Sequence, residues 1–187
     1  ILAYDYPPYN SIAAQRPASW AKYLHRYGVK PTVVTLHWDR EISSDREYII
    51  PSFNKEVTKE ESTTSQIIRV PFVPNWRDKI LHKNGFDKFS FLRKLLTVYY
   101  HTTNHILSNS ISVKNIYRQA HSELSTDQYD VIIATGEPFI LFNYAYRLSK
   151  THQVPWVADY RDAWTNNPSM KNASPYFKSI NKWYFRL

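Results

Sequence analysis

The chain contains no cysteine among its 187 residues. A disulfide framework, a thiolate zinc site and a cysteine nucleophile are therefore all excluded. This composition fits a reducing compartment, and the sequence shows no charged segment followed by an apolar leader of the kind used for export. We therefore expect a cytoplasmic protein. The first residue is Ile1 rather than methionine, and we expect the chain to be a piece of a longer protein.

Glycine is almost as scarce, with only Gly28, Gly85 and Gly136 in the whole chain. A dinucleotide-binding fingerprint needs three clustered glycines and a phosphate loop needs two, because the backbone must approach the phosphates where a Cβ would collide. The sequence therefore contains neither motif. Long apolar runs are also missing, since a membrane-spanning helix needs roughly 18 to 20 apolar residues and the run from Phe139 is already interrupted at Asn143.

Basic residues exceed acidic ones by 24 to 16, which gives a formal charge of +8. Such an excess favours anionic partners, namely nucleic acid, anionic lipid headgroups or phosphorylated substrates. Six basic residues and two acids lie between Arg77 and Lys94, interleaved with phenylalanine and leucine up to Leu96. This mixture is typical of a segment that lies on a membrane surface. A solvated face that flanks an ordinary core helix would have the same composition, and both interpretations stay open.

Apolar periodicity predicts alternating strands and helices along the chain. We expect strands at residues 1–4, 32–38, 130–135 and 154–159 and in the stretch QIIRV, and helices at residues 12–27, 89–107, 112–124 and 139–150. The first helix is predicted from a stripe of Ile12, Ala13, Arg16, Trp20, Leu24 and Tyr27, with Gly28 as its C-terminal cap. Residues 39–65 are polar and are expected to form an extended hairpin or excursion.

This alternation predicts the fold class α/β: one doubly wound, mostly parallel Rossmann-like sheet over residues 1–187, with helices on both faces. Parallel sheets bind their ligands just beyond the carboxyl ends of their strands. The loops YPPYNS, GEP and DYRDAW each follow a predicted strand. We therefore expect all three loops to lie at one edge of the sheet.

Three charged residues, Asp159, Arg161 and Asp162, end the strand VPWVAD. An acid with a neighbouring cation can orient a substrate hydroxyl or accept its proton. A salt-bridged turn in which one carboxylate caps the next helix would use the same residues. We take the three as catalytic candidates, and both interpretations stay open at this point.

Gly136 and Glu137 form a second candidate, because they end a buried strand and precede a helix whose free amides favour anions. Glu137 could meet a substrate hydroxyl there or simply complement the helix dipole. A metal site is not predicted: His101 and His105 in HTTNH share a helical face, but no acidic third ligand follows them.

The order of YPPYNSIAAQRP, VTLHW, DVIIATGEP and PWVADYRDAW resembles the N-terminal domain of retaining GT-B glycosyltransferases of the family 4-like group. The resemblance covers essentially the whole chain. It implies an acceptor-side domain that works with a C-terminal, nucleotide-sugar-binding domain, with catalysis in the cleft between them. That donor-side domain is absent from these residues, and we expect the chain alone to be inactive.

The resemblance also implies roles for single residues. The loop Pro8, Ser11, Ile12, Ala13 would meet the sugar diphosphate, with Arg16 as the cation behind it. Gly136 and Glu137 fall at a Glu-Pro pair of such enzymes, and Asp159, Arg161 and Asp162 fall among acceptor-side polar groups. We expect Trp164 to form a wall of the same pocket.

The implied partners are a nucleotide sugar and a glycan or lipid-linked acceptor, in cell-surface polysaccharide assembly at the inner face of the plasma membrane. No metal cofactor and no nucleic acid are expected. Two alternatives from other classes remain: a basic nucleic-acid-binding module, which would show salt-sensitive binding, and another nucleotide- or phosphate-binding α/β protein.

Overall fold

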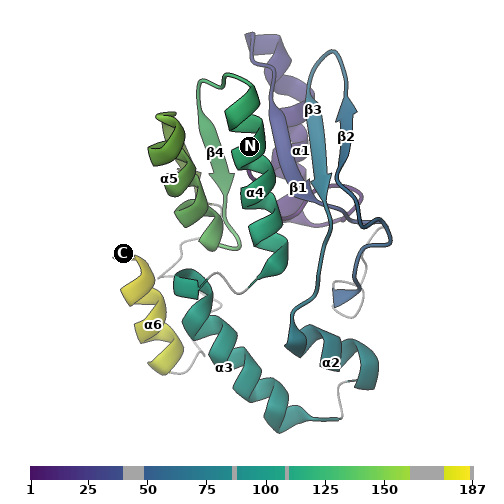
Figure 1. Cartoon of the computed structure of the whole chain (residues 1–187), viewed down its shortest axis with the longest axis vertical. Coiled ribbons are helices and arrows are strands. Elements are labelled where there is room, and N and C mark those ends of the chain that lie inside the picture. The colour runs from purple at the N-terminus through teal and green to yellow at the C-terminus, as the bar shows by residue number, and fades with distance from the viewer. Residues whose placement is uncertain (40–48, 86–87, 108–109, 161–174, 186–187) are drawn as a thin grey trace.

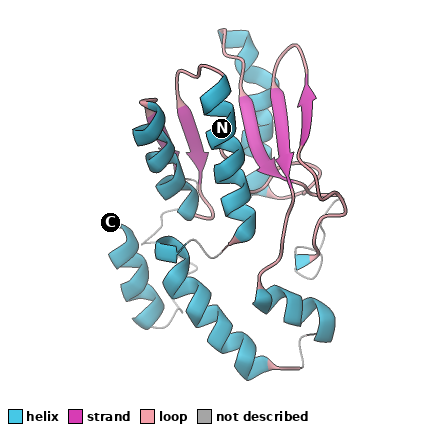
Figure 2. Ribbon diagram, in the orientation of Figure 1, coloured by secondary structure: helices cyan, strands magenta, loops and turns pink. Residues whose placement is uncertain are grey.

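The computed structural model describes residues 1–39, 49–85, 88–107, 110–160 and 175–185, and it shows a mixed α/β chain (Figures 1 and 2). The described helices are α1 Ile12–Tyr23, α2 Trp76–Asn84, α3 Ser90–Leu107, α4 Ile111–Thr126, α5 Ile140–His152 and α6 Pro175–Phe185, with a short 3-10 helix η1 at Leu24–Tyr27. The strands are β1 Thr32–Leu36, β2 Thr58–Glu61, β3 Gln66–Val70, β4 Ile132–Thr135 and β5 Trp156–Asp159. The predicted α/β class is confirmed, but residues 1–4 form isolated bridges at Leu2 instead of a strand, and the described strands do not make up a full doubly wound sheet.

The strands form a three-stranded mixed sheet in the order β1-β3-β2 and a two-stranded parallel sheet of β4 and β5. β1 and β3 are parallel, whereas β2 and β3 form the antiparallel hairpin expected in the polar excursion. Leu2 joins the two sheets through parallel bridges to Val34 and Ala134. Its N–H donates to the Ile133 carbonyl at 2.7 Å, and its own carbonyl accepts from Thr135 N–H at 3.0 Å.

Side chains on the two faces of these strands pack into two different clusters, because successive residues of a strand point to opposite sides. Val34, Leu36 and Ile68 pack with α4 and α5 in the larger cluster. Val33 and Ile67, their neighbours in sequence, pack with Ala21 of α1 in the smaller one. Figure 1 accordingly shows α4 in front of β1 and α1 behind it. Helices therefore cover both faces of β1 and β3.

Helix α1 begins where Ser11 caps it and continues through η1 to Gly28, whose φ of 76° confirms the predicted C-terminal cap. The predicted apolar stripe of this helix is wrong. Its buried residues are Ala14, Pro17 and Ala21, while Ile12 is 86% exposed. Small side chains allow a helix to lie close against strands, and the larger apolar residues are then left outside the contact.

Two further features differ from the sequence prediction. Helix α2 was not predicted, because WRDKILHKN shows no apolar period and buries only Leu81. Strand β5 is not apolar on both sides as expected: Val157 is half exposed, since β5 pairs only with β4 among the described strands. In the part of the chain described here, no helix has the length and apolarity needed to cross a bilayer.

Candidate functional site at the carboxyl ends of the strands

Arg16 of α1 and Asp159 of β5 form an ion pair, with Arg16 Nη1 at 2.6 Å from Asp159 Oδ1. Asp159 is the last residue of its strand, and Arg16 follows the loop that leaves residues 1–3. The helix that follows the first loop and the end of β5 therefore meet at this edge, and the remainder of the DYRDAW loop beyond Tyr160 lies outside the described residues. The carboxylate side chain is largely buried, whereas the Arg16 side chain is 41% exposed and keeps a face toward solvent.

Asp159 also holds the predicted GEP turn in place. Its backbone carbonyl accepts a hydrogen bond from Gly136 N–H at 3.1 Å, just past the end of β4. The second carboxylate oxygen, Oδ2, is buried and has no hydrogen-bond partner among the described residues. Buried carboxylate oxygens are normally paired, so Oδ2 is an exception, while the Asp159 side chain as a whole keeps 18% of its surface exposed.

Ser11 organises the first loop of the site. Its Oγ accepts from Ala14 N–H at 3.0 Å, which caps α1, and donates to Asp5 Oδ2 at 3.3 Å. Asp5 was not among the predicted site residues. Its position in the sequence could have indicated it. Asp5 is the first acid after the paired residues 1–3, and it therefore lies at the same edge of the sheet as Asp159.

The other residues predicted to bind substrate differ in their exposure. Gly136 is buried, and a Cβ placed on it would lie 2.7 Å from a ring carbon of Phe139. Glu137, Pro8 and Ile12 are exposed, and Ala13 is half-buried. At the carboxyl ends of the strands, the first turn of α1 and the Glu137 carboxylate are thus exposed to solvent.

An aromatic cluster lies directly beside Asp159. The Tyr160 ring is 4.7 Å from the Phe142 ring and 6.1 Å from the Phe139 ring, measured between centroids. Partial burial in this cluster raises the pKa of the Tyr160 hydroxyl. Tyr160 therefore packs on Phe139 and Phe142 directly after the strand end, while the predicted wall at Trp164 lies outside the described residues.

Three predicted site residues, Arg161, Asp162 and Trp164, lie outside the described residues. The predicted charged triad is therefore placed only at Asp159. In the described ranges, no three histidine, aspartate or glutamate side chains gather closely enough to hold a metal ion.

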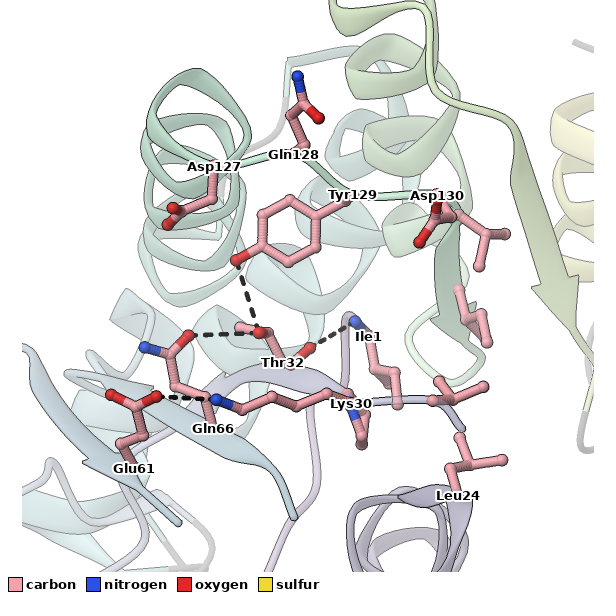
Figure 3. Close-up of a pocket in the computed structure, with 14 residues that line it drawn as sticks. Ile1, Leu24, Lys30, Thr32, Glu61, Gln66, Asp127, Gln128, Tyr129 and Asp130 are labelled. Carbon is pink, nitrogen blue, oxygen red and sulfur yellow. Dashed lines mark hydrogen bonds and ion pairs between the residues drawn. The ribbon is translucent and has the colours of Figure 1, made fainter. Parts of the chain in front are cut away.

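A cavity of about 500 Å³ lies at the opposite, amino ends of the strands (Figure 3). Its polar groups largely satisfy one another: Lys30 pairs with Glu61 at 2.9 Å, and the Thr32 hydroxyl donates to Gln66 Oε1 at 3.2 Å. None of the predicted site residues lines this cavity. Ligands of parallel sheets bind at the other edge, so we assign the candidate site to Arg16 and Asp159.

Three comparisons of this chain with known proteins found no match. No protein-family model, curated protein or solved structure matches it. The function must therefore be inferred from the residues of the site.

Taken as chemistry, the site combines a guanidinium with one exposed face, a buried carboxylate with one unsatisfied oxygen, and the first turn of a helix. A guanidinium and free helix amides bind phosphate oxygens. A positioned carboxylate oxygen binds a hydroxyl. Such a site suits a reaction between a phosphorylated donor and an alcohol.

Proposed function

We propose that the chain is the acceptor-side domain of a retaining GT-B glycosyltransferase, which moves a sugar from a nucleotide sugar to a glycan or lipid-linked acceptor. The same proposal takes the fold as one doubly wound, Rossmann-like half of the enzyme. Its support is the pairing of residues 1–3 between β1 and β4, together with helices on both faces of the strands. The donor-binding half would be a second domain.

The observation that carries the proposal is the 2.6 Å contact between Arg16 and Asp159. It brings together the loop expected to meet a sugar diphosphate and the strand end expected to meet the acceptor. The two residues lie 143 positions apart in the sequence. Their meeting gives one place where a leaving phosphate and an incoming hydroxyl can both be held.

In the proposed reaction, a bond forms between the acceptor oxygen and the anomeric carbon of the donor sugar. The bond from that carbon to the diphosphate oxygen breaks on the same face. The proton of the acceptor hydroxyl passes to the departing diphosphate. The Asp159 carboxylate, whose side chain is 18% exposed, orients the hydroxyl and so places its oxygen for attack.

The departing diphosphate carries the charge that develops in the reaction. The exposed face of Arg16 and the N–H groups of the first turn of α1, at Ile12 and Ala13, are the positive groups available for it. Asp159 keeps Arg16 in a fixed direction through their ion pair. Fixed charges of this kind stabilise a transition state because they need no reorganisation as it forms.

Calorimetric titration with a panel of UDP- and GDP-sugars tests the proposal. The full-length gene product should bind one donor in the micromolar range and transfer its sugar. The 187-residue chain alone should bind every donor only weakly and transfer none. Micromolar binding by the 187-residue chain would contradict the two-domain assignment, and failure of the full-length product to bind any donor would contradict the proposed function.

A further inference from the structure

Helix α3 exposes an apolar row to solvent. The row consists of Phe91, Leu92, Leu95, Val98 and Tyr99, which we call the α3 patch. These positions have the spacing i, i+1, i+4, i+7 and i+8 and therefore share one face of a helix. Phe91 is 74% exposed and Leu95 is 52% exposed, so the row is not part of the core of the described chain.

The more polar side of the helix is the more covered one. Arg93, Thr97 and His101 are half-buried, and α3 contacts α2 and α5. The Arg93 Nε donates to the Lys88 carbonyl at 3.2 Å, which keeps this guanidinium beside the start of the helix. Leu96 and Tyr100 are also half-buried, so the covered side mixes polar and apolar residues, whereas an ordinary surface helix turns its main apolar face to the core.

Positive charges surround the α3 patch. Lys79, Lys83, Lys88 and Lys94 are all exposed. Within residues 76–85 and 88–107 the only acid is Asp78, and its carboxylate is paired with Arg77 at 2.8 Å. The surface around the apolar row therefore carries a net positive charge.

Trp76 extends this surface onto α2. It is exposed, with Lys79 Nζ at 5.0 Å from the centre of its ring, and its backbone N–H donates to the Tyr100 hydroxyl at 3.2 Å. Trp76, Lys79 and Tyr99 line a cavity of about 240 Å³ at this edge. Tryptophan and tyrosine, with an apolar ring and a polar end, are the residues enriched where a protein meets both hydrocarbon and water.

We propose that α3 docks on an anionic lipid bilayer. The α3 patch enters the boundary between headgroups and acyl chains, Trp76 lies at the headgroup level, and the four lysines contact lipid phosphates and carboxylates. The apolar row from Phe91 to Tyr99 runs about 12 Å along one face of the helix, parallel to its axis. Helix α3 would therefore lie parallel to the membrane surface. This inference does not depend on the proposed sugar transfer.

The charge pattern favours a bilayer over a second copy of the chain. In a symmetric dimer the same surface would face itself, and Lys88 and Lys94 would approach the same residues of the other copy. Like charges across an interface are unfavourable, whereas the same lysines match an anionic membrane. In Figure 1, α2 and α3 lie beyond the ends to which the β3 and β4 arrows point, so docking would hold the candidate site near the membrane.

A fluorescent probe tests the docking directly, because the chain has no cysteine of its own and a single one can be labelled. Leu95→Cys carries an environment-sensitive dye in the middle of the α3 patch, and Tyr27→Cys carries the same dye at an exposed site of η1. Vesicles of phosphatidylcholine with 30% phosphatidylglycerol should blue-shift and brighten the first dye and leave the second unchanged. Vesicles of phosphatidylcholine alone should have little effect on either.

Co-sedimentation with the same vesicles separates the apolar and electrostatic contributions. Phe91→Ser with Leu95→Ser should lower the partition constant by at least roughly tenfold. Lys83→Gln, Lys88→Gln and Lys94→Gln together should lower it by roughly fivefold for each charge, and added salt should release the wild type. The matched controls are Tyr27→Ser with Val29→Ser, and Lys22→Gln with Arg26→Gln and Lys30→Gln, all exposed in or near η1. Both controls should bind like the wild type.

Circular dichroism shows that each variant is folded before its binding is compared. Equal binding of the wild type to neutral and anionic vesicles would overturn the proposal, as would a loss shared equally by the control variants. Analytical ultracentrifugation tests whether a second copy of the chain binds the α3 patch instead of a membrane. A dimer that Leu95→Asp dissociates would assign the α3 patch to a second copy of the chain and would also overturn the proposal.

Discussion

Arg16, in the second turn of α1, and Asp159, the last residue of β5, are joined by a 2.6 Å ion pair across 143 positions of sequence. The pair connects the first crossover of the chain to the last described strand. Because Gly136 N–H also donates to the Asp159 carbonyl, α1, the turn after β4 and the end of β5 are connected at this point. The first two predictions separate what this pair does for stability from what it does for activity.

For stability, Arg16→Gln and Asp159→Asn should each lower the free energy of unfolding by only about 1 kcal/mol or less. The Arg16 side chain is 41% exposed, so solvent screens most of the attraction. A double-mutant cycle in urea should give a coupling free energy of roughly 0.2–1 kcal/mol. A coupling of several kcal/mol would show that the pair is a structural element of the fold.

For activity, Asp159→Asn and Asp162→Asn should each lower turnover of the full-length enzyme by roughly ten- to a thousandfold, as expected when one positioned polar group is lost. Steady-state kinetics with the donor and acceptor identified by titration measures the effect. Lys22→Gln, on the same helix as Arg16, is the control and should leave turnover unchanged. If both asparagine variants keep wild-type turnover and differ only in melting temperature, these charges form a structural turn.

The sequence predicted the order of elements well because apolar periodicity and caps are local signals. Gly28 illustrates the second signal, since a glycine at the end of a helical segment marks the left-handed residue that follows α1 and η1. The burial of Ile12 was predicted wrongly because which face of α1 meets the strands depends on close packing of Ala14 and Ala21, a tertiary effect. Helix α2 lacks any period, and its cap at Asn75 was the only local signal.

The candidate site was predictable in part for a different reason. The rule that parallel strands deliver ligand-binding residues to one edge placed Asp159 and Gly136 together, without any knowledge of side-chain contacts. The partner of Asp159 came from the resemblance, which singled out Arg16. The buried and unsatisfied Oδ2 of Asp159 depends on the packing around one atom, and no sequence pattern reports it.

The cap of α1 gives a third prediction. Ser11→Ala removes the acceptor of Ala14 N–H and the donor to Asp5, and it should lower the free energy of unfolding by about 1 kcal/mol. Ser19→Ala is the matched control, because Ser19 is exposed inside the same helix, where alanine is the better helix former. Urea denaturation should show a loss for the first variant and no loss for the second. Equal effects would mean that Ser11 does not act as a cap.

Because His101 is partly buried, the stability of the folded chain should fall as the pH is lowered. Burial against the Phe177 ring, 4.5 Å away between centroids, lowers the pKa of His101 below its usual 6.5. Between that lowered pKa and 6.5 the unfolded chain binds more protons than the folded one, so stability falls as the pH falls through this window. His101→Phe should therefore lose less melting temperature than the wild type between about pH 7.5 and about pH 5.5. A variant with the wild-type pH slope would contradict this, and His25→Gln, exposed in η1, is the control.

Gly136 gives the sharpest test of the packing beside the candidate site. A Cβ at this position would lie 2.7 Å from Cε1 and 2.8 Å from Cδ1 of Phe139, closer than side-chain atoms normally approach. Gly136→Ala should therefore lower the free energy of unfolding by roughly 1–3 kcal/mol, the usual cost of overpacking. In a Phe139→Ala background the two closest contacts are gone and Phe142 Cζ at 3.1 Å remains, so the same substitution should cost less. Gly28→Ala is the control: no atom lies within 4 Å of its Cβ, and its cost of about 1 kcal/mol comes from its φ of 76°. That cost should be the same with or without Phe139. If Gly136→Ala costs equally in both backgrounds, the close approach to Phe139 does not determine the packing of this turn.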